Sequence, residues 1–273
     1  MFNFRALPLF VLTMAGVLPA LRANDRNFAY AYESAVLPAG EREVEFSTTW
    51  RHGRDGQFYS EFDHRAELEW GLGGNWQTSF YLNWQQVTAE NFDPVTGASL
   101  GNSHAFEFKG ISSEWKYKLL DPVADRIGLA LYGELSLGSD EVELESKLIL
   151  DKKIGRHLFA YNLVGEYEVQ YTPGHRASAL KIQNDLGYSL GFGDHFSAGL
   201  ELNTRAERAG GVWEYHALYA GPVIHYTAKN WWVTLTALQQ LPALKKSAAT
   251  PDSRYIFDEQ ERTNIRLLLS HRF

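Results

Sequence analysis

Side chains of alternating character run through most of the chain, and the stretch from Thr263 to Phe273 shows the pattern most clearly. Successive side chains of a β-strand point to opposite faces, so every second residue belongs to one face. The stretch therefore predicts a strand with one apolar face and one polar face, ending on an aromatic residue of the apolar side. The two faces are Thr263, Ile265, Leu267, Leu269, His271 and Phe273 against Arg262, Asn264, Arg266, Leu268, Ser270 and Arg272.

The same two-residue period begins near Gly40 and recurs between clusters of Gly, Pro, Asp and Asn. It predicts about twelve strands, an even number, as bacterial single-chain barrels have. Two strands are irregular. The fourth, expected over 106–119, changes its pattern near Gly110, which suggests a bulge, and the tenth, expected over 213–226, contains Pro222, which cannot donate to a ladder.

The connections between these strands alternate in length. Short turns are expected at Gly71, Asp121, Lys152, Gly193 and Lys229, and they fall on one side of the sheet. The two long polar connections, 88–103 and 242–261, fall on the other side. Short periplasmic turns and longer outer loops are typical of outer-membrane barrels.

The direction of the apolar face follows from the number and length of the strands. Eight strands already enclose an interior that side chains can just fill, so about twelve strands with apolar side chains inside would leave an apolar hole. Charged side chains at most polar-face positions fit a wet interior instead. The sequence therefore predicts an all-β fold, a transmembrane antiparallel up-and-down β-barrel of about twelve strands; the main alternative is a secreted two-sheet sandwich.

Composition excludes several other classes of protein. The mean hydropathy is −0.31, and no apolar run beyond the N-terminus approaches the ~20 residues that a membrane helix needs. The formal charge of −7 argues against nucleic acid as a partner. The chain has no Cys, which excludes disulfides, metal thiolates and a lipoprotein anchor.

The first residues have the features of a secretory signal: Arg5, an apolar run over 6–21 and a small residue at Ala23. We expect cleavage after Ala23, although Leu21 is an unusual residue at the −3 position. The predicted organisation is a signal peptide at 1–23, an N-terminal periplasmic segment at 24–39 and the barrel at 40–273. The mature chain would then carry 24 basic and 33 acidic residues, a formal charge of −9.

The closing strand that ends on Phe273 resembles the assembly signal of bacterial outer-membrane β-barrels. The opening third resembles small outer-membrane barrels of undefined function, which are similar to channel proteins encoded with aromatic-degradation pathways. The resemblance implies this fold and a place in the outer membrane of a Gram-negative bacterium. Where those barrels usually carry Thr-Asp-Arg in the turn, this chain has Gly73-Gly74-Asn75. The matching residues are 37–43 (LPAGERE), 67–72 (ELEWGL) and 75–77 (NWQ).

The polar faces place many charged residues in one predicted lumen. Acidic ladders such as Glu41/Glu43/Glu45 favour a cation-preferring pore, because rings of acid select cations. The alternative is that the acids pair with Arg and Lys and make a narrow, rigid and nearly closed barrel. The lumen-lining candidates are Glu43, Glu45, Asp63, Arg65, Glu67, Glu69, Glu143, Glu145, Lys147, Glu166, Glu168, Lys181, Asp185, Glu201, Arg205 and Arg266.

No catalytic or metal-binding motif stands out. None of the nine His lies in a Gly-x-Ser-x-Gly or His-Glu-x-x-His context, and no zinc, calcium or phosphate-loop motif occurs. His64 and His271 fall on the predicted lipid face, where a membrane-embedded hydrolase would keep its base. An interfacial His is the simpler interpretation. We expect no enzyme activity, no catalytic residues, no metal and no cofactor.

The sequence thus predicts a passive pore or transporter-like barrel for small polar or cationic solutes. Its expected partners are outer-membrane lipid, the barrel assembly machinery and small solutes, and no nucleic acid. Two alternatives stay open: a non-conducting structural or adhesin-like surface barrel, and a membrane-embedded hydrolase. A pore conducts ions, an adhesin loses binding when its loops are trimmed, and a hydrolase turns over lipid until one His is changed.

Removing Phe273 should impair assembly in the outer membrane, because the chain would lose the terminal aromatic of its closing strand. The measurement is the fraction of heat-modifiable barrel in outer-membrane preparations of cells expressing the full chain or the truncation. Phe273→Tyr, which keeps an aromatic ring, is the matched control. Normal assembly of the truncated chain would contradict the assignment of Phe273 as an assembly signal.

Overall fold

The computed structural model describes residues 25–54 and 57–273. The predicted signal peptide, 1–23, and residue 24 lie outside this range. The described residues form twelve β-strands and no helix. In chain order the strands are β1 (Arg42–Arg54), β2 (Gln57–Gly73), β3 (Trp76–Phe92), β4 (Ser99–Leu120), β5 (Gly128–Leu137), β6 (Glu141–Ile154), β7 (His157–Thr172), β8 (His175–Phe192), β9 (Phe196–Ala209), β10 (Val212–Thr227), β11 (Trp231–Lys245) and β12 (Thr263–Arg272).

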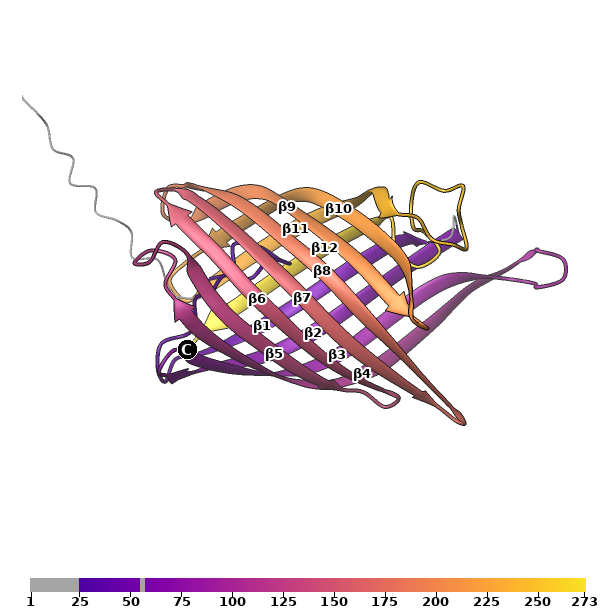
Figure 1. Ribbon diagram of the computed structural model, residues 1–273, viewed down its shortest axis with the longest axis horizontal. Coiled ribbons are helices and arrows are strands. Elements are labelled where there is room, and N and C mark those ends of the chain that lie inside the picture. The colour runs from indigo at the N-terminus through magenta and orange to yellow at the C-terminus, as the bar shows by residue number, and fades with distance from the viewer. Residues whose placement is uncertain (1–24, 55–56) are drawn as a thin grey trace, which may run out of the picture.

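The twelve strands form one closed antiparallel barrel in which each strand pairs with its neighbours in sequence and β12 pairs with β1 (Figure 1). Phe46 of β1, for example, lies opposite Ala66 of β2 and Leu269 of β12. Closure leaves the wall without an edge strand, although a strand that projects beyond its neighbour, as β4 does before Ile111, pairs on one side only there. The predicted all-β, antiparallel up-and-down fold with twelve strands is confirmed.

Apolar side chains point outward and polar side chains point inward along the wall. In β1, Glu43 and Glu45 are 0% and 2% exposed, whereas Val44 and Phe46 between them are 43% and 38% exposed. The same alternation continues around the barrel, with Leu131 at 49% and Leu200 at 62% exposed. An apolar outer band over a polar interior is the arrangement that a membrane barrel presents to lipid. None of the described residues belongs to a helix long and apolar enough to cross a membrane.

Both predicted irregularities lie in continuous strands. Asn83 lies opposite Gly110 and Trp84 opposite Phe108, so Lys109 is the extra residue of a bulge in β4. Gly110 has a φ of 112°, a conformation that a residue with a Cβ rarely adopts. In β10, Pro222 lies opposite Leu200 of β9.

The polar connection predicted at 88–103 is wrong. Strands β3 and β4 continue to pair through most of it, with Thr88 opposite His104, and they extend as a hairpin beyond the rest of the wall (Figure 1). The connection itself is only 93–98, where Asp93 accepts backbone hydrogen bonds from Val95 and Thr96. The sequence pattern fails here because both faces of this hairpin meet solvent, so no alternation marks it. Likewise, β11 continues to Lys245 and shortens the last connection to 246–262.

The two ends of the barrel differ less than the sequence predicted, because the end that carries the longest connection also has connections as short as 173–174 and 210–211. The end at which β1 starts and β12 finishes, here called the turn end, has connections as short as 74–75, 155–156 and 193–195. The opposite end, here called the loop end, carries the long connection 246–262 and the projecting β3–β4 hairpin (Figure 1).

We expect Leu131→Arg, on the outward face of β5, to lower the unfolding free energy of the barrel in lipid by about 2–4 kcal/mol, because it moves a charge into hydrocarbon. The measurement is urea unfolding of the protein refolded into vesicles. Leu100→Arg is the matched control, because Leu100 is 66% exposed near the tip of the projecting hairpin. Equal losses for both variants would contradict a lipid-facing outer wall.

Candidate functional site

The sixteen predicted lumen-lining residues all lie at inward positions of the wall, and ion pairs connect several of them. Lys181 contacts Glu166 at 2.6 Å and also pairs with Glu168. Lys147 contacts Glu145 at 2.8 Å. The arrangement matches the alternative in which interior acids and bases neutralise one another. A role for these residues in conduction remains a prediction.

Residues 25–39, here called the inner segment, lie inside the barrel at the turn end (Figure 1). Phe28, Ala29 and Ala31 are fully buried, and Leu37 is 1% exposed. The sequence analysis placed this part of the chain outside the barrel, in the periplasm. The structure instead packs it against the inner face of the wall, while the orientation of the barrel in a membrane remains a prediction.

Glu201 of β9 anchors the inner segment through its backbone. Its carboxylate accepts hydrogen bonds from the backbone N–H groups of Ala29 at 3.1 Å, Tyr30 at 2.9 Å and Ala31 at 2.9 Å. The hydroxyl of Thr236 donates to the same carboxylate at 2.5 Å. Hydrogen bonds to an ionised acceptor are stronger than neutral ones. One wall residue therefore satisfies three successive N–H groups of a chain that has no strand partner.

Two amides of the wall complete this anchoring. The Asn162 side chain of β7 accepts from the N–H of Tyr32 at 2.6 Å and donates to its carbonyl at 3.0 Å, as a neighbouring strand would. Gln77 of β3 accepts from the N–H of Leu37 at 2.9 Å. The wall thus supplies side-chain partners for a buried backbone, which must be hydrogen bonded to be stable there.

Glycines in the strands make room for the inner segment. A Cβ on Gly187 of β8 would lie 2.7 Å from ring atoms of Phe28. A Cβ on Gly71 of β2 would lie 2.1 Å from the carbonyl oxygen of Pro38. Glycine inside a strand often marks a close approach of other groups, and at these positions that group is the inner segment.

Glu33 brings a carboxylate of the inner segment into the interior. Its side chain accepts hydrogen bonds from the backbone and side-chain nitrogens of Asn27, at 2.9 and 3.2 Å. Burial raises the pKa of Glu33 to about 7; the hydrogen bonds from Asn27 oppose this rise, and the Asp151 carboxylate adds to it. Glu33 therefore titrates near neutral pH.

Residues 246–262, here called the inner loop, connect β11 to β12 at the loop end, and Ile256 and Glu261 of this loop enter the interior. Ile256 is fully buried in a cluster with Tyr215, Tyr219 and Leu238. Sequence analysis treated this stretch as a polar outer connection. The structure shows that part of it folds back into the barrel.

Glu261 of the inner loop is the charged centre of this end. It is fully buried and contacts Arg51 at 3.3 Å and Arg205 at 2.9 Å. Burial alone would raise the pKa of Glu261, but the two guanidinium groups hold it at about 2. The Arg205 guanidinium also lies 5.9 Å from the ring centre of Tyr30 in the inner segment. The inner segment and the inner loop thus reach the same group of arginines in the middle of the barrel.

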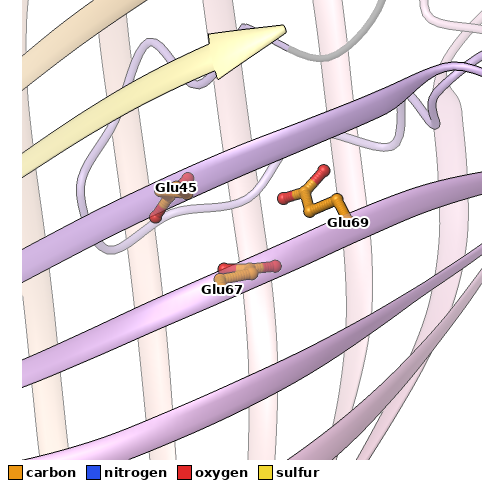
Figure 2. Close-up of side chains that lie close together, drawn as sticks. All are labelled: Glu45, Glu67 and Glu69. Atoms are coloured by element: carbon orange, nitrogen blue, oxygen red, sulfur yellow. The ribbon is translucent and has the colours of Figure 1, made fainter. Parts of the chain in front are cut away.

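Three carboxylates of the first two strands converge on one point at the turn end (Figure 2). Each of Glu45, Glu67 and Glu69 offers an oxygen, and these oxygens lie within 4.8 Å of one another. These three residues, here called the acidic cluster, are all buried. Arg26 of the inner segment contacts Glu45 at 3.4 Å, and Gln77 donates to Glu69 at 3.0 Å.

A second group of carboxylates, Glu141, Glu143 and Glu168, also has oxygens within 4.8 Å of one another. Lys181 pairs with Glu168 there. The sequence analysis predicted no metal site, and neither group has a motif spacing that could reveal it. Both depend on residues of two paired strands that face the same point of the interior.

His64, one of the two lipid-face histidines considered for a hydrolase, lies among aromatic rings. His64 stacks on Phe62 and Trp84, with ring centres 6.2 and 5.5 Å apart. Its Nδ1 atom has no hydrogen-bond partner, so no acid orients it from that side. This environment fits an apolar packing role better than a general base, which needs an orienting partner.

The sequence pattern did not identify the inner segment, Asn162 or Glu261 as parts of one interior site. Two signals were present. One is the apolar character of 28–37, unusual for an exposed linker, and the other is glycine at inward strand positions such as Gly71 and Gly187. Neither signal identifies the partner, because the contacts join residues far apart in the chain.

Comparisons with known proteins agree with this architecture. A family model described as Family of unknown function (DUF6662) matches residues 20–273. No curated protein sequence matches the chain significantly. Among solved structures, the chain is similar to a NanC porin with a TM-score of 0.53 and to a KdgM porin with a TM-score of 0.50. Each is 10% identical, and each match covers 84% of this chain and 98% of the porin. At this identity the similarity shows the fold alone.

We expect Gly187→Val to release the inner segment, because the new side chain would occupy the place of the Phe28 ring. The measurement is trypsin cleavage after Arg26, which is only 6% exposed in the seated segment, followed by mass spectrometry. Gly191→Val is the matched control on the same inward face, since a Cβ there would meet only Arg156 O, at 3.7 Å.

The release should be reversed in the double variant Gly187→Val/Phe28→Ala, because removal of the ring restores the space. Cleavage that is equally slow in wild type and Gly187→Val, in a barrel with normal heat-modifiable migration, would show that the segment does not depend on this contact.

Proposed function

The chain belongs to the Family of unknown function (DUF6662), and we propose that it acts as a passive, porin-like pore for small polar or cationic solutes in the bacterial outer membrane. The observation that carries this proposal is the wall itself. It is a closed twelve-strand barrel with an apolar outer face and charged side chains at inward positions of most strands, whereas β10 and β11 turn residues such as Tyr219 and Trp232 inward. A polar lumen inside an apolar wall is the common design of barrels that pass solutes through a membrane.

The similar solved structures support the same function. Both are described as porins, and the match covers nearly the whole of each porin chain. The resemblance of the opening third to channel proteins of aromatic-degradation pathways also favours transport of small molecules. By analogy with such barrels, the turn end would face the periplasm and the loop end would face outward.

If the barrel is a pore, the described conformation is its closed state, because two parts of the chain occupy the interior. The inner segment enters from the turn end and the inner loop from the loop end, and they meet near Tyr30 and Arg205. The inner segment is held by hydrogen bonds and ion pairs rather than by the strand ladder. It can therefore leave without opening the wall, which would then enclose a polar path rich in carboxylates.

A second function is favoured by one specific observation. The β3–β4 hairpin projects from the loop end and exposes apolar side chains, with Phe106 at 70% and Leu100 at 66% exposed. Such a surface suits a non-conducting barrel that binds a partner through its hairpin. Catalysis of lipid hydrolysis is not favoured, given the aromatic surroundings of His64.

Single-channel recording in a planar bilayer tests the pore. The chain has no Cys, so the double variant Asp25→Cys/Thr227→Cys can lock the inner segment to β10 by one disulfide, at side chains that are hydrogen bonded at 2.6 Å. We expect stepwise currents from the mature wild-type chain, no current from the oxidised variant, and currents restored by dithiothreitol. A salt gradient should show preference for cations because of the acidic lining.

Two controls complete the test. Asp25→Ser/Thr227→Ser should conduct like wild type with or without dithiothreitol. Absence of current from a correctly inserted, heat-modifiable barrel, with the disulfide reduced and also after deletion of residues 25–39, would overturn the pore. The non-conducting surface barrel would then be the better interpretation, and binding would be sought at the hairpin.

A further inference from the structure

The acidic cluster concentrates negative charge in the interior, and of the wall cations Lys116 acts on Glu69 and Arg266 on Glu45. Glu45, Glu67 and Glu69 are 2%, 5% and 4% exposed, and their carboxylates share one small volume. Burying like charges together is unfavourable unless a cation or protons balance them. The cluster is therefore stable only with bound protons or with a positive group close by.

Neighbouring interior acids have partners of their own. Glu43 contacts Arg272 at 2.9 Å and accepts from the Trp232 indole at 2.8 Å. Glu114 accepts a hydrogen bond from Tyr81. In contrast, the ion pair that reaches the acidic cluster comes from Arg26, a residue of the inner segment and not of the wall.

Arg26 occupies the cluster incompletely. Only its Nη1 atom contacts Glu45, at 3.4 Å, while its Nη2 atom donates to the carbonyl of Ala29 at 3.0 Å. Its Nε atom and the Oε2 atom of Glu45 are both buried and both lack a hydrogen-bond partner. A guanidinium group normally engages a carboxylate through two parallel hydrogen bonds. The unpaired donor and the unpaired acceptor leave the Glu45 carboxylate with hydrogen-bonding capacity that Arg26 does not use.

Arg26 also has the surroundings of a bound cation. The guanidinium carbon lies 3.9 Å from the ring centre of Tyr32, close enough for a cation–π interaction. The space beside it is small: a cavity of about 10 Å³ lined by Arg26, Glu33, Glu69, Gln77 and Lys116 among others. That volume is sufficient for no more than about one water molecule. A solute can therefore reach the acidic cluster only if Arg26 leaves.

We propose that the acidic cluster is the binding site of the pore for the guanidinium or ammonium group of an organic cation, and that Arg26 is an internal competitor that occupies this site while the inner segment is seated. This inference rests on the proposed function and names its solute class. When a solute cation takes the place of Arg26, the ion pair between the inner segment and Glu45 is lost and the closed conformation is weakened. Binding and opening are thereby coupled through one shared site.

The coupling has a quantitative consequence. A ligand that competes with an internal group binds with an affinity reduced by the fraction of molecules in which the site is free. Removing the Arg26 guanidinium should therefore tighten the binding of a free guanidinium ion. We expect the association constant for the guanidinium ion to increase about ten-fold or more. This corresponds to a site that is free in at most about a tenth of the wild-type molecules.

Isothermal titration of the mature chain, refolded in detergent, with methylguanidinium chloride tests this inference. We expect weak binding to wild type, binding about ten-fold or more tighter to Arg26→Gln, and loss of binding in Arg26→Gln/Glu45→Gln/Glu67→Gln. Arg26→Gln/Glu143→Gln is the matched control, because Glu143 belongs to the second carboxylate group near Lys181, and it should bind like Arg26→Gln. All variants are first shown to be folded by heat-modifiable migration.

Four results would overturn the inference, three of them in the titrations with methylguanidinium and sodium. These three are equal affinity of wild type and Arg26→Gln, binding that survives replacement of both glutamates, and equal binding of sodium at the same concentration. A preference of the site for Ca²⁺ over methylguanidinium would also overturn it, since the site would then be a metal site.

The titration does not depend on conductance. Binding of methylguanidinium by the acidic cluster of a barrel that carries no current would support this site and contradict the proposed pore. Conductance without such binding would support the pore and contradict this binding site.

Discussion

Closure of the strand ladder between β1 and β12 is the constraint on which the rest of the structure depends. Every wall strand then has a partner on both sides, so no edge must be satisfied by another chain or by water. Closure also makes the two faces of the wall unequal, since one faces outward and the other encloses a limited volume. Once Val44 and Phe46 point outward, Glu43 and Glu45 must share the interior with the polar faces of the other strands.

The interior is stabilised by pairing charges and by hydrogen bonding a buried chain, and both depend on two parts of the chain outside the wall strands. Glu201 has a buried carboxylate, and the inner segment supplies three N–H groups to it. Glu261 of the inner loop places a carboxylate between Arg51 and Arg205. Each contact adds a partner to a desolvated charge that the wall satisfies only in part, through Thr236 for Glu201 and through Asp63 for Arg51. The filling of the barrel is thus a consequence of the same alternation that makes its outer face apolar.

The two inner elements are attached differently, and this difference bears on function. The inner loop joins β11 and β12, so it is tied to the wall at both ends, and its Ile256 packs in an apolar cluster. The inner segment leads into the wall strands at Arg42 and is held elsewhere by side-chain hydrogen bonds and by apolar packing of residues such as Phe28 and Ala29. An element of this kind can move without loss of the fold. The charged contact between Arg26 and Glu45 makes its seating sensitive to the cations that the lumen would admit.

The two-residue period of the chain determined the strands, their number, the closed antiparallel order and the outward direction of the apolar face. This information is local, because the alternation of apolar and polar residues within each strand of a wide barrel indicates which side faces lipid and which faces the lumen. The bulge near Gly110 was readable for the same reason. The projecting hairpin was not, because neither face of residues 88–103 is buried. The occupancy of the lumen was decided by tertiary structure, since it depends on contacts such as Tyr32 with Asn162 and Ala29 with Glu201, 130 and 172 residues apart. Such contacts have no period in the sequence; they exist only after the barrel has closed around the chain.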